Sequence, residues 1–153
     1  MTAPQPADPA LPLFFNVDSV VGAAPAQNLR EDVLLVQFYL RTIGDKPLAK
    51  TEPELAAACR KVNVTGVIDP ETIAAIRLRQ QVAKSLDGNS ATVIDGRISP
   101  AKLGYSYGQL WTIVFLNSDI QGRNKDVWPR LDKIAGCPPE LKEMVSRTVV
   151  GKG

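Results

Sequence analysis

The side chains that could carry out chemistry in this sequence are carboxylates and two thiols, because the chain contains no histidine. Hydrolysis of a glycan needs two carboxyl groups held about 5 to 10 Å apart. Asp69 is better explained as a helix cap before Pro70, and Asp95 is typical of a turn before a glycine. No nucleophile-elbow or metal motif accompanies them, so we expect that the chain is not an enzyme. The carboxylates available for such a pair are Asp69, Asp95, Asp119 and Glu140.

The cysteines are Cys59 and Cys137, and they are too few to form a disulfide framework. Without histidine, the sequence argues against a zinc site and against any triad that uses imidazole. We therefore expect no metal and no cofactor. The run LAAACRKV favours a buried, reduced Cys59, although a bond between the two cysteines stays open at this level.

Length and composition are those of one compact globular unit: 153 residues, 44% of them apolar and 22% charged. The net charge of +2 comes from 18 basic and 16 acidic side chains, a balance that does not indicate a nucleic-acid partner. No run is long enough to insert into a membrane as a helix, and the N-terminus lacks the pattern of a secretory signal. We expect the chain to be cytoplasmic as synthesised.

Residues 28–44 form the clearest predicted element, a helix with apolar side chains on most of its circumference. Asn28 and Glu31 have the spacing of a capping box, and Gly44 suits the position just past a helix end. A helix that is apolar nearly all round is normally buried between two layers. We expect the elements after residue 105 to cover its second face, which carries Leu34, Leu35, Phe38 and Tyr39.

Further helices are predicted from their start signals. Thr51 and Glu54 fit a capping box for a helix that ends near Asn63, and Asp69 with Pro70 opens a third helix. Residues 105–120 suit either a strand or a buried helix by composition, and a helix is favoured because the pair at 99–100 (SP) resembles a helix start. Two short helices are expected in 127–136 and 138–150.

A six-residue turn occurs twice, as TGVIDP at 65–70 and DGRISP at 95–100. Both copies run in the order small polar residue, glycine, any residue, isoleucine, capping residue and proline. Both are typical of a tight turn that leads into a helix, and neither requires catalysis.

Two stretches in this order resemble the peptidoglycan-binding-domain-like family. Residues 33–40 match its V-x-x-L/V-Q-x-x-L helix, and residues 65–80 are similar to its D-G-x-x-G-P-x-T-x-x-A-V-x-x-F-Q signature. The resemblance covers roughly residues 20–117, including DGRISP and the pair Leu116 and Asn117 of more elaborate members. Thr65 replaces the acidic first residue of the signature and Arg79 replaces its aromatic residue, a change that bears on ligand binding more than on the fold.

The resemblance implies a mainly α fold, a three-helix orthogonal bundle with additional C-terminal helices. It divides the chain into a flexible leader at 1–19, a peptidoglycan-binding-like domain at 20–120 and a helical extension at 121–153 that packs on the same core. The function it implies is non-catalytic attachment to cell-wall peptidoglycan, reached by a non-classical export route. The ligand-binding candidates are Gln37, Arg41, Arg77 and Gln80, with Tyr105, Tyr107 and Trp111 for stacking on sugar rings.

A structural or adaptor role in a phage-tail-like or contractile-injection assembly is the alternative, with a protein in place of the wall as the partner. Family members of this kind are found in such machinery as well as beside cell-wall hydrolases. An adaptor that keeps the fold without the wall ligand would account for Arg79 and for the long C-terminal extension. The sequence leaves both functions open.

Overall fold

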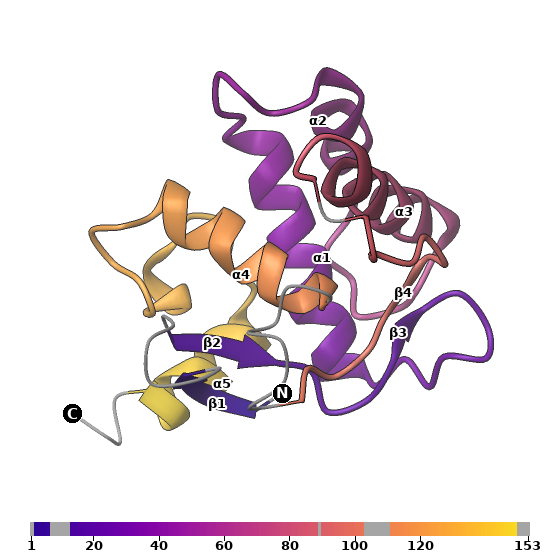
Figure 1. Ribbon diagram of the computed structural model, residues 1–153. Helices are drawn as coiled ribbons and strands as arrows, with labels where there is room; N and C mark the ends of the chain where they lie inside the picture. The colour runs from indigo at the N-terminus through magenta and orange to yellow at the C-terminus, as the bar shows by residue number, and fades with distance from the viewer. Residues whose placement is uncertain (1, 7–12, 89, 103–110, 150–153) are drawn as a thin grey trace.

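A computed structural model describes residues 2–6, 13–88, 90–102 and 111–149, and it is mainly helical. Figure 1 shows one helix, α1, through the middle of the molecule, with α2 and α3 on one side and α4 and α5 on the other. No helix among these residues is long and apolar enough to cross a membrane. The helices are α1 (Arg30–Asp45), α2 (Pro53–Arg60), α3 (Pro70–Ser85), α4 (Thr112–Arg123), the 3-10 turn η2 (Leu131–Lys133) and α5 (Pro139–Val149).

Helix α1 is buried on nearly its whole circumference, as its sequence predicts. Every residue from 32 to 40 is buried, and the second face is covered as completely as the first. α1 contacts α2 and α3 through one side and α4 and α5 through the other. The expectation that elements after residue 105 cover the second face is therefore confirmed for Leu35, Phe38 and Tyr39, which share one core cluster with α4 and α5.

Both predicted ends of α1 are wrong, for reasons that concern neighbouring segments. The backbone of Asn28 has a φ of +55°, and its side chain accepts a hydrogen bond from the Gly22 N–H (2.7 Å) and donates one to the Gly22 carbonyl (3.1 Å). Asn28 thus holds a strand rather than capping α1. Gly44 lies inside the helix, where a Cβ atom would be 2.5 Å from the backbone nitrogen of Arg60. Its role is to let α2 approach closely.

The start of α3 is as predicted, whereas that of α2 is not. The Thr72 N–H donates to the Asp69 carboxylate (2.8 Å), and Pro70 occupies the first helical position, where its missing N–H costs nothing. Thr51 caps no helix, because its hydroxyl accepts from the Leu48 N–H instead (2.9 Å). α2 ends at Arg60, three residues before the predicted end.

Two antiparallel strand pairs hold the N-terminal part of the chain. β1 (Thr2–Pro6) pairs with β2 (Leu13–Asn16), and β3 (Val21–Gly22) pairs with β4 (Arg97–Ile98). Over 1–19, where a flexible leader and a tether were expected, the described residues form β1 and β2, and the side chains of Phe15 and Val17 are buried in the core. The second copy of the turn contains β4, and the described residues directly after it are not helical. The next helix that the structure describes, α4, begins at Thr112, and residues 103–110 lie outside the described part.

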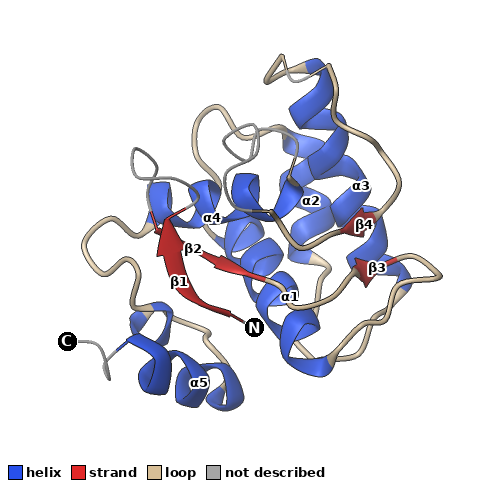
Figure 2. Cartoon of the chain, turned by 60° about the horizontal axis from the view of Figure 1, so that its bottom comes forward, coloured by secondary structure: helices blue, strands red, loops and turns tan. Residues whose placement is uncertain are grey.

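The C-terminal segment packs on the same core cluster as α1 through Leu131, Ile134, Leu141 and Val145. The prediction of a helix over 127–136 is wrong, since the helical part of that segment is the single 3-10 turn η2. The helix expected over 138–150 is present as α5. β2 contacts α4 and β1 contacts α5, so the strand pair lies between these two helices (Figures 1 and 2).

One buried side chain, Asn117 of α4, connects three of these elements. Its amide oxygen accepts from the Phe15 N–H (2.8 Å) and from the Tyr39 hydroxyl (3.0 Å), and its amide nitrogen donates to the Phe15 carbonyl (2.9 Å). Asn117 therefore pairs with β2 as a neighbouring strand would, while it also ties β2 and α4 to α1.

Candidate functional site

Gln37, one of the predicted ligand residues, is fully buried and is used inside the protein. Its amide oxygen accepts from the backbone N–H groups of Thr65 (2.8 Å) and Gly66 (2.9 Å). Its amide nitrogen donates to the carbonyl of Val67 (2.9 Å). The side chain thus holds the first turn, which leads into α3, and it is not exposed to a ligand.

Gln80 on α3 does the same for the second turn. It is 2% exposed, accepts from the Gly96 N–H (3.0 Å) and donates to the Arg97 carbonyl (2.9 Å). Each copy of the six-residue turn is therefore held by a buried glutamine on the helix that comes before it in the chain. The repetition seen in the sequence reflects one structural device used twice.

The first residue of each turn also has one role in both copies. The Thr65 hydroxyl accepts from the Val67 N–H (3.1 Å), and the Asp95 carboxylate accepts from the Arg97 N–H (2.9 Å). These are the short side-chain-to-backbone turns that threonine and aspartate both form. Thr65 consequently replaces the acidic residue of the family signature without loss of the turn.

Of the remaining predicted ligand residues, the structure describes Arg41, Arg77 and Trp111, and each has its own surroundings. Arg41 bonds to Asp45 in the next turn of α1 (3.0 Å), whereas Arg77 is exposed on α3 and its side chain lies over Gly96 of the second turn. Trp111 is partly buried against the core at the start of α4. The remaining two, Tyr105 and Tyr107, lie outside the described residues.

The carboxylates considered for catalysis have structural partners. Asp69 caps α3, and Asp95 shapes the second turn. Asp119 pairs with Arg79, and Glu140 pairs with Arg30 across the surface (2.6 Å). Among the described residues, no group of three or more histidine, cysteine or acidic side chains is placed to hold a metal ion.

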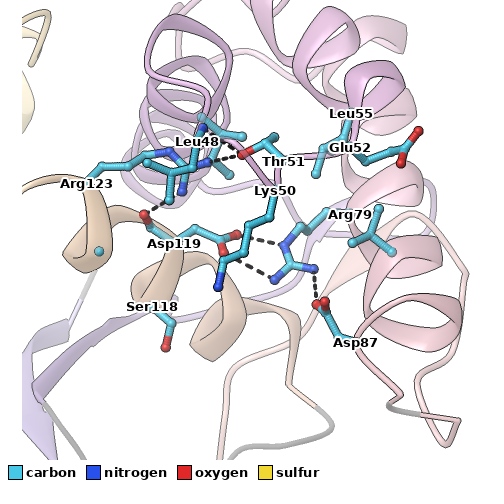
Figure 3. Close-up of a pocket in the computed structure, with 13 residues that line it drawn as sticks. Leu48, Lys50, Thr51, Glu52, Leu55, Arg79, Asp87, Ser118, Asp119 and Arg123 are labelled. Atoms are coloured by element: carbon cyan, nitrogen blue, oxygen red, sulfur yellow. Dashed lines mark hydrogen bonds and ion pairs between the residues drawn. The ribbon is translucent and has the colours of Figure 1, made fainter.

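A pocket of about 330 Å³ lies at the junction of the end of α1, the loop before α2, the middle of α3 and the second half of α4 (Figure 3). None of the five predicted ligand residues that the structure describes lines it. Its volume is at the lower end of the range for small-molecule sites. Its charged lining residues are Lys50, Glu52, Arg79, Asp87, Asp119 and Arg123.

Arg79 is the centre of this lining. Its side chain is 8% exposed and bonds to Asp119 on α4 (2.7 Å) and to Asp87 just past the end of α3 (3.1 Å), as Figure 3 shows. The guanidinium also lies 5.5 Å from the centre of the Phe115 ring. Arg79 thus occupies a core-lining position, as the aromatic residue of the signature would, and its charge is paired there.

Burial sets the ionisation of the groups around Arg79. Burial lowers the pKa of the Arg79 guanidinium, but the Asp119 and Asp87 carboxylates outweigh it and the net pKa is raised. Although 22% of the Asp119 side chain is exposed, burial raises the pKa of this carboxyl, and Arg79 only partly offsets the effect. Burial also raises the pKa of the Cys59 thiol to about 12, and the nearby Asp119 carboxylate adds to this shift. Cys59 is therefore a protonated, unpaired core thiol.

Among the residues that the structure describes, Arg123 at the end of α4 hydrogen-bonds to uncharged oxygens. It donates to the carbonyls of Lys46 (2.7 Å) and Asp119 (2.8 Å) and to the Thr51 hydroxyl (2.9 Å). Burial lowers the pKa of its guanidinium. The arginine joins α4 to the loop before α2 and forms one wall of the pocket.

Sequence reasoning missed this pocket because its lining comes from four separate segments. One signal was present, since Arg79 stands where the signature has an aromatic residue. An arginine at a core position needs carboxylate partners, but the sequence alone does not show that Asp119 and Asp87 supply them.

Comparison of the chain with protein-family models, with curated proteins and with solved structures finds no match.

Proposed function

We propose that the chain is a non-catalytic binding module with the framework of peptidoglycan-binding-like proteins, and that it attaches to cell-wall glycopeptide. In this proposal α1, α2 and α3 are the three-helix bundle, and α4 and α5 are the elaboration. The observation that carries it is the buried Gln37 clamp. Gln37 is the glutamine of the first motif, and it directly binds the turn that opens the second motif. The two stretches that resemble the family are therefore joined as one structural unit.

The surface beside the second turn is the candidate contact for the wall. Arg77 is exposed there, beside the partly exposed Arg97, whose guanidinium also bonds the Ala24 carbonyl (3.2 Å). Two guanidinium groups next to a rigid turn provide donors for the carboxylates and amides of a stem peptide.

Sedimentation with insoluble peptidoglycan tests the proposal at low and at moderate salt. Wild-type protein is expected in the pellet, and Arg77→Ala is expected to reduce the bound fraction several-fold. Lys84→Ala is the matched control, because Lys84 is an exposed cation seven residues further along the same face of α3, away from the turn. Wild-type protein that stays in the supernatant at both salt concentrations would contradict wall attachment.

A role as an adaptor in a larger assembly is the second candidate, favoured by the exposed apolar side chains around the two turns. Val67 is 63% exposed, Leu86 is 64% exposed and Val93 is 65% exposed. Exposed apolar side chains of this size suit a contact with another protein better than a contact with a glycan.

A pull-down with the full chain from its native host tests this second candidate. The expected result is one stoichiometric protein that is lost when Val67 and Val93 are both replaced by serine. Capture that is unchanged in the double variant would refute a contact through these loops.

A further inference from the structure

The pocket in Figure 3 has a glycine in its wall that the fold does not explain. Gly122 is the next-to-last residue of α4 and lines the pocket. Glycine inside a helix is less favourable than alanine, because it loses more conformational freedom on folding. A glycine there needs a reason.

The other glycines in the described part of the chain each have a structural reason. Gly22, Gly66, Gly88, Gly96 and Gly136 have positive φ angles, and a Cβ atom on Gly44 would collide with α2. Gly122 has neither property, since a Cβ atom there would meet no atom within 4 Å. The missing side chain leaves open space at this part of the pocket wall.

The charged groups of the pocket balance one another. Three cations, Lys50, Arg79 and Arg123, face three carboxylates, those of Glu52, Asp87 and Asp119. A ligand with a single sign of charge would meet like charges on one side of the pocket, whereas a ligand with both signs can pair each end.

Unused polar groups of opposite sign remain after the internal bonds are formed. Within the described residues, Lys50 has no hydrogen-bond or ion-pair partner, and Figure 3 shows its side chain reaching from the loop before α2 toward α4. Asp87 bonds to Arg79 through one carboxylate oxygen and leaves the other free. A carboxylate of the ligand can thus bind Lys50, and an ammonium group can bind Asp87.

Most of the uncharged lining is apolar and the space is small. Ile43, Leu55 and Val82 supply an aliphatic surface between the polar groups. A pocket of about 330 Å³ admits a compound of amino-acid or dipeptide size and excludes a glycan chain.

We propose that this pocket binds a small zwitterion of amino-acid or dipeptide size, with its carboxylate at Lys50, its ammonium group at Asp87 and its aliphatic part against Leu55 and Val82. Gly122 forms the open wall through which the ligand enters.

Titration of the isotope-labelled full chain with alanyl-alanine, followed by NMR, tests this proposal. Wild-type protein should show saturable shifts at the pocket-lining residues of α3 and α4. Gly122→Leu fills the space and should weaken binding by about tenfold or more, whereas Gly122→Ala should stay within about threefold of wild type. Gly122→Ala should remain folded, because a Cβ atom at this position meets no atom within 4 Å, and the NMR spectrum of Gly122→Leu shows directly whether that variant is folded.

Two modified probes test the assigned ends of the ligand. The dipeptide amide lacks the carboxylate and the acetylated dipeptide lacks the ammonium group, so each should bind more weakly than alanyl-alanine. The Lys50→Gln variant should bind alanyl-alanine several-fold more weakly than wild type does. Its affinity for the dipeptide amide should be unchanged. Absence of shifts in the wild type, equal binding by Gly122→Leu, or equal binding of all three probes would each overturn the proposal.

This inference is independent of wall attachment, which we place beside the second turn. If the protein binds alanyl-alanine but does not sediment with peptidoglycan, only the proposed function is refuted. If it sediments with peptidoglycan but does not bind alanyl-alanine, only the proposal about the pocket is refuted.

Discussion

Asn117→Ala removes the side chain that connects β2, α1 and α4, and it should strongly destabilise the protein. Alanine leaves three buried groups without their partner: the N–H and the carbonyl of Phe15 and the hydroxyl of Tyr39. A buried polar group that loses its partner costs about 1 to 3 kcal/mol. The expected loss in free energy of unfolding is therefore at least about 3 kcal/mol, a large part of the roughly 5 to 15 kcal/mol of a typical domain.

Urea unfolding followed by circular dichroism and tryptophan fluorescence measures this loss. Tyr39→Phe removes only one of the three bonds and should cost about 1 kcal/mol. Ser118→Ala is the neighbouring control on α4, and because Ser118 is exposed it should change stability by less than about 0.5 kcal/mol. If Asn117→Ala unfolds at the same urea concentration as Ser118→Ala, Asn117 does not hold β2 on the core.

Three further predictions concern thiols, acid and packing. Cys59 and Cys137, whose pKa values burial raises to about 12, should react with Ellman's reagent only at the rate of unfolding, and fast reaction of the native protein would contradict their burial. A hydrogen bond from Arg130 lowers the pKa of Asp132, so its contribution to stability is present above pH of about 4 and lost as the pH falls further. The difference in melting temperature between wild type and Asp132→Asn should accordingly shrink from pH 6 to pH 3, and a constant difference would argue against this pair. Gly44→Ala should cost about 1 to 3 kcal/mol in urea unfolding, because its Cβ atom would collide with the backbone of α2, and an unchanged midpoint would show that α2 moves freely.

The fold could be predicted where the signal was local and strong. The apolar circumference of α1 and the Asp69 and Pro70 start of α3 depend on nearby residues, and both predictions are confirmed. The cap at Asn28 failed because Gly22, six residues earlier, binds its amide, and β3 receives the side chain instead of α1. The second turn failed as a helix start because two of its own residues, Arg97 and Ile98, form β4 and pair with β3.

The candidate site was harder to predict because its side chains act across segments. Gln37 and Gln80 were chosen for their motif positions, and both are buried against the turns that those motifs contain. A motif position shows that a residue matters but not whether it contacts a ligand or the fold. The Arg79 pocket needs α3 and α4 to be placed against each other, and no spacing along the chain contains that information.

The two glutamine clamps also bear on the order in which the chain folds. Gln37 bonds to a glycine 29 residues away, and Gln80 bonds to one only 16 residues away. The longer closure costs about 0.5 kcal/mol more in chain entropy. The unit of α3 and the second turn can therefore assemble from nearby residues before α1 is in place. α3 would then dock on α1 as a preformed piece, already carrying the edge on which β3 pairs.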